Sequence, residues 1–431
     1  MTRGVIGKTG KKIAMSRRLL ILVDNLPRAR FFSRFESVLR KQQWEPIYLC
    51  YKASAFARIR SAGGQAVMLR LSGKRRVATV DEEACARSLD VLRGDIGIRT
   101  ALKKAKLIVP ALQRALDDYQ PERVFLWNGS QLVERLMTSV LPSQLTRQYF
   151  EIANIPGKMF VDATGVNAAS SIYHHPEHLE TTETPSEKEY QAWRAKYLEQ
   201  KRGGGVPQAK SAQSLPWERP FDVLGSLCGR GFYQMQVNRM ALRIQGKMKT
   251  KGVMEALHRK HPPRLNQRPY IFLPFQVSED TQLLLNSDVA NVQALEIAAE
   301  LARAKGHALI AKIHPAENSV AAVRELEDSF ARVPKEVDLT LSTVSTTELI
   351  NESEGVVTIN STVGLETLII GKPLKVLGRA LFTHFIDRPD LLRIYLLRYL
   401  VPVDYFSDSP ITEHQLESIL QRQPGVPCTH Y

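Results

Sequence analysis

The sequence has no uninterrupted apolar run that approaches the roughly 18 residues of a membrane-spanning helix, although 44% of its 431 residues are hydrophobic. This absence excludes an integral membrane protein. Cysteine is also scarce, and the four cysteines stand far apart with no Cys-x-x-Cys pair. A disulfide scaffold or a zinc knuckle is therefore not expected, and the pattern fits a reducing cytosol. These residues are Cys50, Cys85, Cys228 and Cys428.

Several functional signatures are missing as well. The sequence has no serine nucleophile elbow and no Asp-x-Asp element of the kind that holds a metal-bound sugar diphosphate. It has neither a zinc finger nor an RNA-recognition signature, so nucleic acid is not an expected partner. Residues 174–178 offer histidine and glutamate as metal-ligand types, but their spacing favours a solvated loop. No metal and no cofactor is expected.

Acidic residues are too few to balance the basic ones. The sequence has 59 Lys and Arg against 44 Asp and Glu, which gives a net charge of +15. An excess of this size favours an anionic partner, and a phospholipid surface or a phosphorylated and carboxylated substrate would fit. We therefore keep an anionic membrane surface as a possible partner.

The hydrophobic pattern predicts an α/β protein. Short apolar runs alternate with helical segments, which is typical of parallel sheets with helices on both faces. The expected strands are 19–23, 46–50, 123–127 and 148–151, and then 270–274, 308–312, 355–359 and 375–377. We interpret the two series as two Rossmann-like lobes that face each other across a cleft. Ligands in such sheets bind at the carboxyl ends of the strands.

Changes in composition give the expected domain boundaries. Residues 1–15 form a basic flexible tail, 16–180 an N-terminal acceptor and catalytic lobe, and 181–265 a polar connector with helices. Residues 266–385 form a C-terminal nucleotide-binding lobe, and 386–431 a tail that packs back on the first lobe. The apolar segment 391–400 carries two arginines, so it could instead dock on anionic lipid.

A phosphate site is predicted where the strand at 355–359 meets the next helix. Ser361 and Thr362 stand at the start of that helix, where free N–H groups and the helix dipole favour an anion. Glu366 lies about one turn further on and could reach a ribose hydroxyl. Gly364 permits close approach of a ligand or of backbone. The alternative is ordinary helix capping, which needs only a hydroxyl residue.

Three more segments of the second lobe supply candidate ligands. Lys312 and His314 are two residues apart near the end of a strand, so both side chains are expected on the same face of the sheet. There the histidine could donate a hydrogen bond to a phosphate. Ser345 and Thr346 begin a helix with a capping-box pattern. Gln276 lies in the polar segment 274–282, just past a strand. Structural roles remain open for the histidine turn and for the capping box.

Two carboxylates of the first lobe are candidates for the chemistry. Glu151 lies at the end of a strand, and Asp162 precedes a loop rich in glycine and asparagine. Either can act as a general base or as a nucleophile. The alternative for one of them is that it orders this loop.

Taken in order, the second-lobe motifs resemble the capsular polysaccharide biosynthesis proteins of the bacterial β-Kdo transferase group. The matching pieces are Pro274-Phe275-Gln276 with Asp280-Thr281-Gln282, Lys312-Ile313-His314-Pro315, Val344-Ser345-Thr346 with Glu348-Leu349, Asn360-Ser361-Thr362 through Glu366, Gly371-Lys372-Pro373 and Leu377-Gly378-Arg379-Ala380. They span about 270–385, and 148–172 matches loosely. Where the family often has a second acid after Glu151, this sequence has Ile152.

The resemblance implies a GT-B glycosyltransferase that uses CMP-activated Kdo. His314, Ser361 and Thr362 would then bind the CMP phosphate, Glu366 the ribose, and Ser345 with Thr346 the phosphate or base. The expected enzyme is cytoplasmic, works at the inner face of the membrane and modifies a lipid or glycan acceptor in capsule or surface-polysaccharide synthesis. The alternatives are a CDP-polyol phosphotransferase of similar fold and a non-catalytic polysaccharide assembly or export protein.

Overall fold

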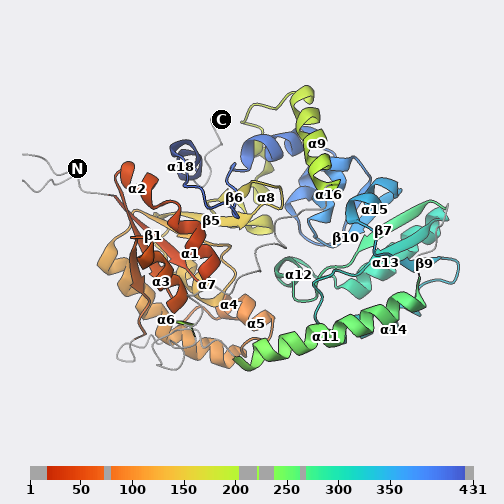
Figure 1. The fold of residues 1–431 in the computed structure, drawn as a ribbon, viewed down its shortest axis with the longest axis horizontal. Coiled ribbons are helices and arrows are strands. Elements are labelled where there is room, and N and C mark those ends of the chain that lie inside the picture. The colour runs from red at the N-terminus through yellow and green to blue at the C-terminus, as the bar shows by residue number, and fades with distance from the viewer. Residues whose placement is uncertain (1–16, 72–78, 203–220, 223–236, 263–267, 423–431) are drawn as a thin grey trace, which may run out of the picture.

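The computed structural model of the 431-residue chain describes residues 17–71, 79–202, 221–222, 237–262 and 268–422. The basic lead, much of the polar connector, Cys228 and Cys428 lie outside these residues. Two sheets form the cores of two lobes, which lie side by side in Figure 1. We call the unit around the first sheet the N-lobe and the unit around the second sheet the C-lobe. The predicted fold class, α/β with two Rossmann-like lobes, is confirmed.

The N-lobe sheet has the strand order β3-β2-β1-β4-β5-β6, with β6 antiparallel to β5 and the other pairs parallel. Its central strand β1 is apolar and buried from Leu19 to Val23, because both faces of the sheet are covered by helices. Leu20 and Leu22 enter one core cluster, while Leu19 and Ile21 enter the other. The strands are β1 (Arg17–Val23), β2 (Trp44–Cys50), β3 (Gln65–Met68), β4 (Arg123–Leu126), β5 (Thr146–Ile152) and β6 (Met159–Asp162).

Helices cover both faces of this sheet. The residues that follow β6 form short helical turns, whose Ile172 and Leu179 belong to the same core cluster as Leu20. The N-lobe helices are α1 (Leu26–Ser33), α2 (Glu36–Lys41), α3 (Ala53–Ser61), α4 (Glu82–Ala86), α5 (Leu89–Leu92), α6 (Ile98–Tyr119), α7 (Leu132–Val140), η1 (Asn167–Ala169), α8 (Ser171–His174) and η2 (Pro176–Leu179).

One helix begins earlier than the sequence pattern indicates. By sequence, residues 24–27 indicate a loop after the apolar run 19–23, but only part of them is one. Asn25 caps α1 by accepting a hydrogen bond from the Arg28 N–H at 3.0 Å, and Pro27 fits the first turn. The amphipathic pattern over 31–40 indicates a single helix, whereas the structure has two, α1 and α2, separated at Arg34 and Phe35.

The C-lobe sheet is entirely parallel, with the order β11-β10-β7-β8-β9. One core cluster lies between this sheet, α13 and α14, and another lies under α15 and α16. The elements are β7 (Tyr270–Pro274), α12 (Thr281–Asn286), α13 (Asn291–Lys305), β8 (Ala308–Lys312), α14 (Val320–Phe330), β9 (Leu339–Leu341), α15 (Thr346–Glu352), β10 (Gly355–Thr358), α16 (Val363–Ile370), β11 (Leu374–Val376) and η4 (Leu381–Phe385).

The lobes are linked by α9 (Glu187–Arg202) and α11 (Val237–Lys260), and the C-terminal segment returns to the N-lobe as α17 (Pro389–Ile394), η5 (Tyr395–Tyr399) and α18 (Glu413–Leu420) (Figure 1). Val401 pairs with Met159 beside β6, and α18 lies beside α2. Both arginines of the segment 391–400 are paired with α9, Arg393 with Glu187 and Arg398 with Glu189. This segment is therefore packed inward and does not offer its apolar face to lipid. No helix within the described ranges is long and apolar enough to cross a bilayer.

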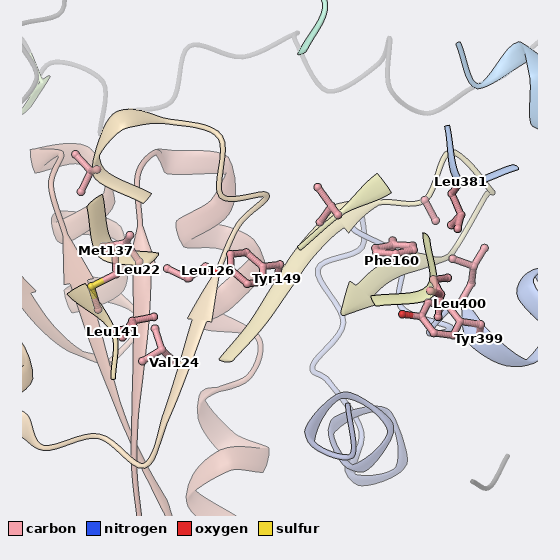
Figure 2. Close-up of a cluster of buried hydrophobic side chains, with 14 of the residues drawn as sticks. Leu22, Val124, Leu126, Met137, Leu141, Tyr149, Phe160, Leu381, Tyr399 and Leu400 are labelled. Carbon is pink, nitrogen blue, oxygen red and sulfur yellow. The ribbon is translucent and has the colours of Figure 1, made fainter. Parts of the chain in front are cut away.

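A single apolar cluster joins the two lobes. Figure 2 shows Leu22, Val124 and Leu126 of the N-lobe sheet at one end, and Leu381, Tyr399 and Leu400 at the other, with Tyr149 and Phe160 between them. Leu365 and Ile369 of α16 belong to the same cluster. The N-lobe sheet, α16 and the return segment therefore share one core.

Candidate active site

A cavity of about 470 Å³ lies where the carboxyl ends of the two sheets face each other. In the N-lobe, the chain leaves β1 to build β2 and β3 on one side, and then builds β4 and β5 on the other. In the C-lobe, β8 and β9 lie on one side of β7, and β10 and β11 on the other. The loops diverge at such switch points and leave a crevice that binds ligands. The cavity joins both crevices, since Trp127 and Asn128 line it from the first and Gln276 and Asn360 from the second.

The C-lobe side of the cavity is held by a reciprocal amide pair. The Gln276 side chain donates to Asn360 Oδ1 at 2.9 Å, and its own Oε1 accepts from the Asn360 N–H at 3.0 Å. The Asn360 amide in turn donates to the Gln282 and Asn286 carbonyls at 2.8 and 3.2 Å. Because both side chains are almost fully buried, these bonds fix the start of α16 relative to β7 and α12. Gln276 thus lines the cavity and also shapes it.

The start of α16 faces the cavity through Ser361 and Thr362. Ser361 Oγ accepts from the Val363 N–H at 3.3 Å, while Thr362 occupies the N-cap position without a side-chain capping bond. Gly364 is required by packing, since a Cβ at this position would overlap the ring of Phe382. The helix start is thereby pressed against the cavity wall, where its N–H groups and dipole favour an anion.

His314 lies at the same wall, beyond the end of β8. Its Nδ1 accepts a hydrogen bond from the Ala316 N–H at 3.1 Å. The neutral ring must therefore carry its proton on Nε2, which makes that atom a donor. Burial lowers the pKa of His314, and Lys312 lowers it further, while Asp280 and Glu317 act in the opposite direction. Burial and the Ala316 hydrogen bond thus favour the neutral ring with its proton on Nε2.

Four other predicted ligands lie outside the lining of this cavity. Lys312 donates to the Val344 carbonyl at 2.6 Å and to Thr346 Oγ1 at 3.3 Å, so its side chain ties β8 to α15. Lys312 is the last residue of its strand, and the period-two rule does not extend to His314 beyond it. Burial lowers the pKa of Lys312, and the charge of Glu366 opposes this shift.

Ser345 and Glu366 are occupied in the same part of the C-lobe. Ser345 caps α15 by accepting from the Glu348 N–H at 3.2 Å. Glu366 accepts from Lys201 Nζ at 3.1 Å and from the Thr347 hydroxyl, and it thereby holds α9 and α15 against α16. In this structure these residues support the cavity wall from behind.

Glu151 supplies a carboxylate from the N-lobe side of the cavity. One oxygen accepts from Asn128 Nδ2 at 2.9 Å, and the other accepts from the Ile152 N–H at 3.0 Å. Burial raises the pKa of Glu151, while these two hydrogen bonds and the charge of Arg28 reduce the rise. A desolvated carboxylate with a fixed direction suits a nucleophile or a general base.

Asp162 is buried in the loop after β6 and does not line the cavity. Its Oδ1 accepts from the Thr164 and Gly165 N–H groups at 2.8 and 3.2 Å, and its Oδ2 accepts from the Tyr399 hydroxyl at 2.9 Å. Ser171 adds donors from its backbone and its hydroxyl. The structure thus gives Asp162 the surroundings of the alternative interpretation, in which the carboxylate orders the loop.

The sequence reasoning missed a charged group around Arg28, in the helix α1 that follows β1. Arg28 lines the cavity, pairs with Asp24 at 2.5 Å and Glu134 at 3.3 Å, and lies 4.7 Å from the centre of the Trp127 ring. Burial raises the pKa of Glu134 to about 7, and the charge of Arg28 opposes this rise. Asp24, an acidic residue directly after β1, was the sequence signal for this charged group, because β1 borders the switch point where ligands bind.

Within the described part of the chain, one group has the geometry to hold a metal ion: His175, Glu177 and His178, whose ligand atoms lie within 4.8 Å of one another. His175 Nδ1 and Glu177 Oε1 are 3.0 Å apart, and the two rings are stacked. The group is largely exposed and lies outside the cavity lining.

Comparison with known proteins supports the sequence resemblance. Residues 231–385 match the family model described as capsule polysaccharide biosynthesis protein. This segment includes α16, His314 and the Gln276–Asn360 pair. None of the curated proteins matches the chain significantly in sequence.

Solved structures with a similar fold include two from Thermosulfurimonas dismutans. The KpsC β-Kdo 2,7 transferase is 13% identical with a TM-score of 0.42, and the match covers 94% of this chain and 98% of that one. The KpsC β-Kdo 2,4 transferase is 14% identical with a TM-score of 0.34, covering 69% and 86%. A UDP-GlcNAc 2-epimerase from Neisseria meningitidis is 11% identical with a TM-score of 0.28, covering 94% and 98%.

Proposed function

We propose that this protein is a glycosyltransferase. Its residues 231–385 match the capsule polysaccharide biosynthesis family model, and its two facing Rossmann-like lobes have the GT-B arrangement. Its donor is a CMP-activated sugar acid, CMP-Kdo by the sequence resemblance, and its acceptor is a lipid or glycan in capsule or surface-polysaccharide synthesis. One observation carries the proposal. A single cavity combines a fixed carboxylate from one lobe with a helix start and a histidine donor from the other.

The nucleotide belongs to the C-lobe side of the cavity. The phosphate of CMP would accept from the N–H groups at Ser361 and Thr362, and His314 Nε2 would donate to it. As the bond between the anomeric carbon and the phosphate oxygen breaks, negative charge grows on CMP. Donors already in place stabilise that charge most in a site that excludes water. Lys312, Ser345, Thr346 and Glu366 then act by positioning this wall, and Gln276 by holding Asn360.

The sugar lies toward the N-lobe, where Glu151 is the carboxylate that lines the cavity. Two routes are compatible with one such group. Glu151 can remove the proton of the acceptor hydroxyl while that oxygen attacks the anomeric carbon. Alternatively, Glu151 attacks first, CMP leaves, and the acceptor oxygen then replaces the carboxylate with net retention. We assign Asp162 to positioning, because its oxygens are already occupied by backbone and hydroxyl donors.

The test of the donor is a thermal unfolding series with CMP, CDP and UDP at equal concentration. A ligand that binds only the folded state raises the melting temperature, and at equal concentration the tighter ligand raises it more, so CMP should give the largest rise. His314→Ala should remove most of that rise. His175→Ala, an exposed histidine away from the cavity, is the matched control and should leave it unchanged.

The other outcomes point to the alternatives. A larger shift with CDP would favour a CDP-polyol phosphotransferase. No shift with any of the three nucleotides would favour a non-catalytic assembly or export protein, for which Ile152 at the position of the family's second acid is the motivating residue.

We further propose that the enzyme works in the cytoplasm at the inner face of the membrane, where a lipid-linked acceptor would be found. The net charge of +15 supports contact with an anionic surface. The segment 391–400 is packed inside, so that contact would have to come from other basic residues.

A further inference from the structure

A second cavity of about 310 Å³ lies next to the first one. It is lined by α4, by the loops after β4 and β6, by α7, and by α12 from the C-lobe. The two cavities share three lining residues, Asn128, Thr281 and Gln282. Asn128 is also the residue that orients Glu151. A ligand in the second cavity would therefore have one end beside the proposed catalytic carboxylate.

Arg135 of α7 is the notable side chain in this second cavity. It is half-buried, and its Nε is shielded from solvent without a hydrogen-bond partner. Among the residues that the structure describes, its guanidinium has no ion-pair partner within 4 Å. Burial lowers the pKa of Arg135 and the neighbouring charge of Arg87 adds to this effect, while the charges of Glu83 and Asp81 oppose it. The protein therefore keeps a half-buried positive charge in place with no described carboxylate in direct ion-pair contact.

The two acidic residues of the same cavity, Asp81 and Glu83, act on Arg135 only through space and have closer partners of their own. Asp81 caps α4 by accepting from the Ala84 N–H at 2.8 Å. Glu83 lies 3.5 Å from Arg87, one turn further along. Tyr149 and Thr138 share a hydrogen bond of 2.9 Å between their hydroxyls. A ligand suited to this cavity would thus be negatively charged and would accept hydrogen bonds from the N–H groups of Arg135.

A carboxylate or a phosphate has both properties. The guanidinium plane offers two parallel N–H bonds to two oxygens of such a group, and charge-assisted bonds of this kind are about twice as strong as neutral ones. The remaining hydroxyl and amide groups of the cavity can hold sugar hydroxyls. The occupant is then a saccharide that carries an oxyanion.

We propose that the second cavity is the acceptor subsite and that Arg135 binds an acidic group of the acceptor there. The inference rests on the proposed function, since it takes the reaction to occur at Glu151. It adds that the acceptor is itself acidic and that its acid lies on the side of Asn128 away from Glu151. The acceptor hydroxyl then reaches the first cavity past Asn128.

The test uses three probes that differ in one group: octyl glucuronide with a carboxylate, octyl glucose 6-phosphate with a phosphate, and neutral octyl glucoside. Each is titrated calorimetrically, below its micelle concentration, into the full-length protein with CMP present. The wild type should bind at least one acidic probe about tenfold more tightly than the neutral one. Arg135→Ala should abolish that preference and leave the affinity for octyl glucoside unchanged. Arg60→Ala, an exposed arginine outside both cavities, should retain it.

The acidic probe that depends on Arg135 identifies the source of the oxyanion, a sugar carboxylate or a phosphate. Equal binding of all three probes by the wild type, or a preference that survives Arg135→Ala, would overturn the proposal. If the alanine variant does not fold, Arg135→Gln keeps most of the stem and answers the same question. The thermal shift with CMP distinguishes the two proposals: a wild type that ignores CMP but prefers the acidic probe through Arg135 refutes the donor assignment and retains the oxyanion site.

Discussion

At the scale of single residues, two carboxylates with similar sequence settings have opposite surroundings. Glu151 has one side-chain donor, one backbone donor and a cavity in front of it. Asp162 is enclosed by donors from its own loop and from Tyr399. The first arrangement leaves a carboxylate available to a substrate, and the second uses the carboxylate to define the backbone.

We predict that Glu151→Gln lowers turnover of CMP-Kdo with acceptor by at least about 100-fold, because the amide is neither a nucleophile nor a base. Its melting temperature should stay within a degree or two of the wild type. Wild-type turnover should fall at low pH, where Glu151 becomes protonated. Because burial raises the pKa of Glu151, this fall should occur above about pH 4.3, the pKa of an ordinary glutamate. Glu199→Gln, on the exposed face of α9, is the control.

Asp162→Asn should instead lower the stability of the protein more than its turnover. The amide places a donor against the N–H and hydroxyl donors around it, so the free energy of unfolding should drop by about 1–3 kcal/mol in urea titration. Turnover per folded molecule should change less than in Glu151→Gln. If instead Asp162→Asn abolished turnover with unchanged stability, the two roles would have to be exchanged.

At the scale of elements, the start of α16 depends on one close approach. Gly364 lets the helix touch Phe382, and Phe382 lines the first cavity. A side chain at position 364 would push that ring and the helix apart. The geometry of the proposed phosphate site is therefore linked to packing behind it.

We predict that Gly364→Ala costs about 1–3 kcal/mol of unfolding free energy through overpacking, and that it also reduces the thermal shift produced by CMP. The matched control is Gly252→Ala in α11, where an added Cβ meets no atom within 4 Å. There the better helix propensity of alanine should stabilise the protein by up to about 1 kcal/mol. Equal effects of the two substitutions in urea titrations would refute this account of α16.

The sequence was informative about elements and less so about which side chains meet. The apolar runs 19–23 and 270–274 could be predicted as the buried strands β1 and β7, and the helical patterns over 132–139, 291–305 and 363–370 as α7, α13 and α16. The strand β3 was missed because its side chains are only partly buried, and α12 was not predicted because none of its residues is fully buried. The motif containing Ser361 and Thr362 was located correctly at a strand-to-helix turn.

The site residues that sequence reasoning could not place depend on contacts between distant segments. Asp24 is one helical turn from Arg28, but the second partner of Arg28 is Glu134, more than a hundred positions later. Glu366 looked like a ribose ligand by spacing alone, yet it accepts from Lys201 of α9. Neither pairing leaves a local pattern, because both are set by how the lobes and the connector fold together.

At the scale of the whole molecule, the lobes are also joined across the cavities. Arg93, just after α5, donates from Nε to the Glu279 carbonyl at 3.0 Å and from Nη2 to Thr281 Oγ1 at 3.3 Å. Thr281 lines both cavities. This contact therefore connects the N-lobe to the C-lobe wall of each proposed subsite.

We predict that Arg93→Ala loosens this wall without unfolding the protein. Amide hydrogen exchange should accelerate over residues 277–286, and the KM values for donor and acceptor should both rise several-fold, while the unfolding free energy changes by less than about 1 kcal/mol because the contact is partly exposed. Arg99→Ala, an exposed arginine in the first turn of α6, should have none of these effects. Unchanged exchange in Arg93→Ala would show that the bridge does not hold α12.

The apolar cluster that contains Tyr149, Phe160, Leu365 and Leu381 packs residues of both lobes together, whereas the Arg93 contact is a pair of hydrogen bonds. Separating the first would expose a packed core, and separating the second exposes little. We therefore expect any opening of the protein to begin at the Arg93 contact while the apolar cluster stays closed. Substrate entry and product release through that opening would then limit the rate of the proposed reaction.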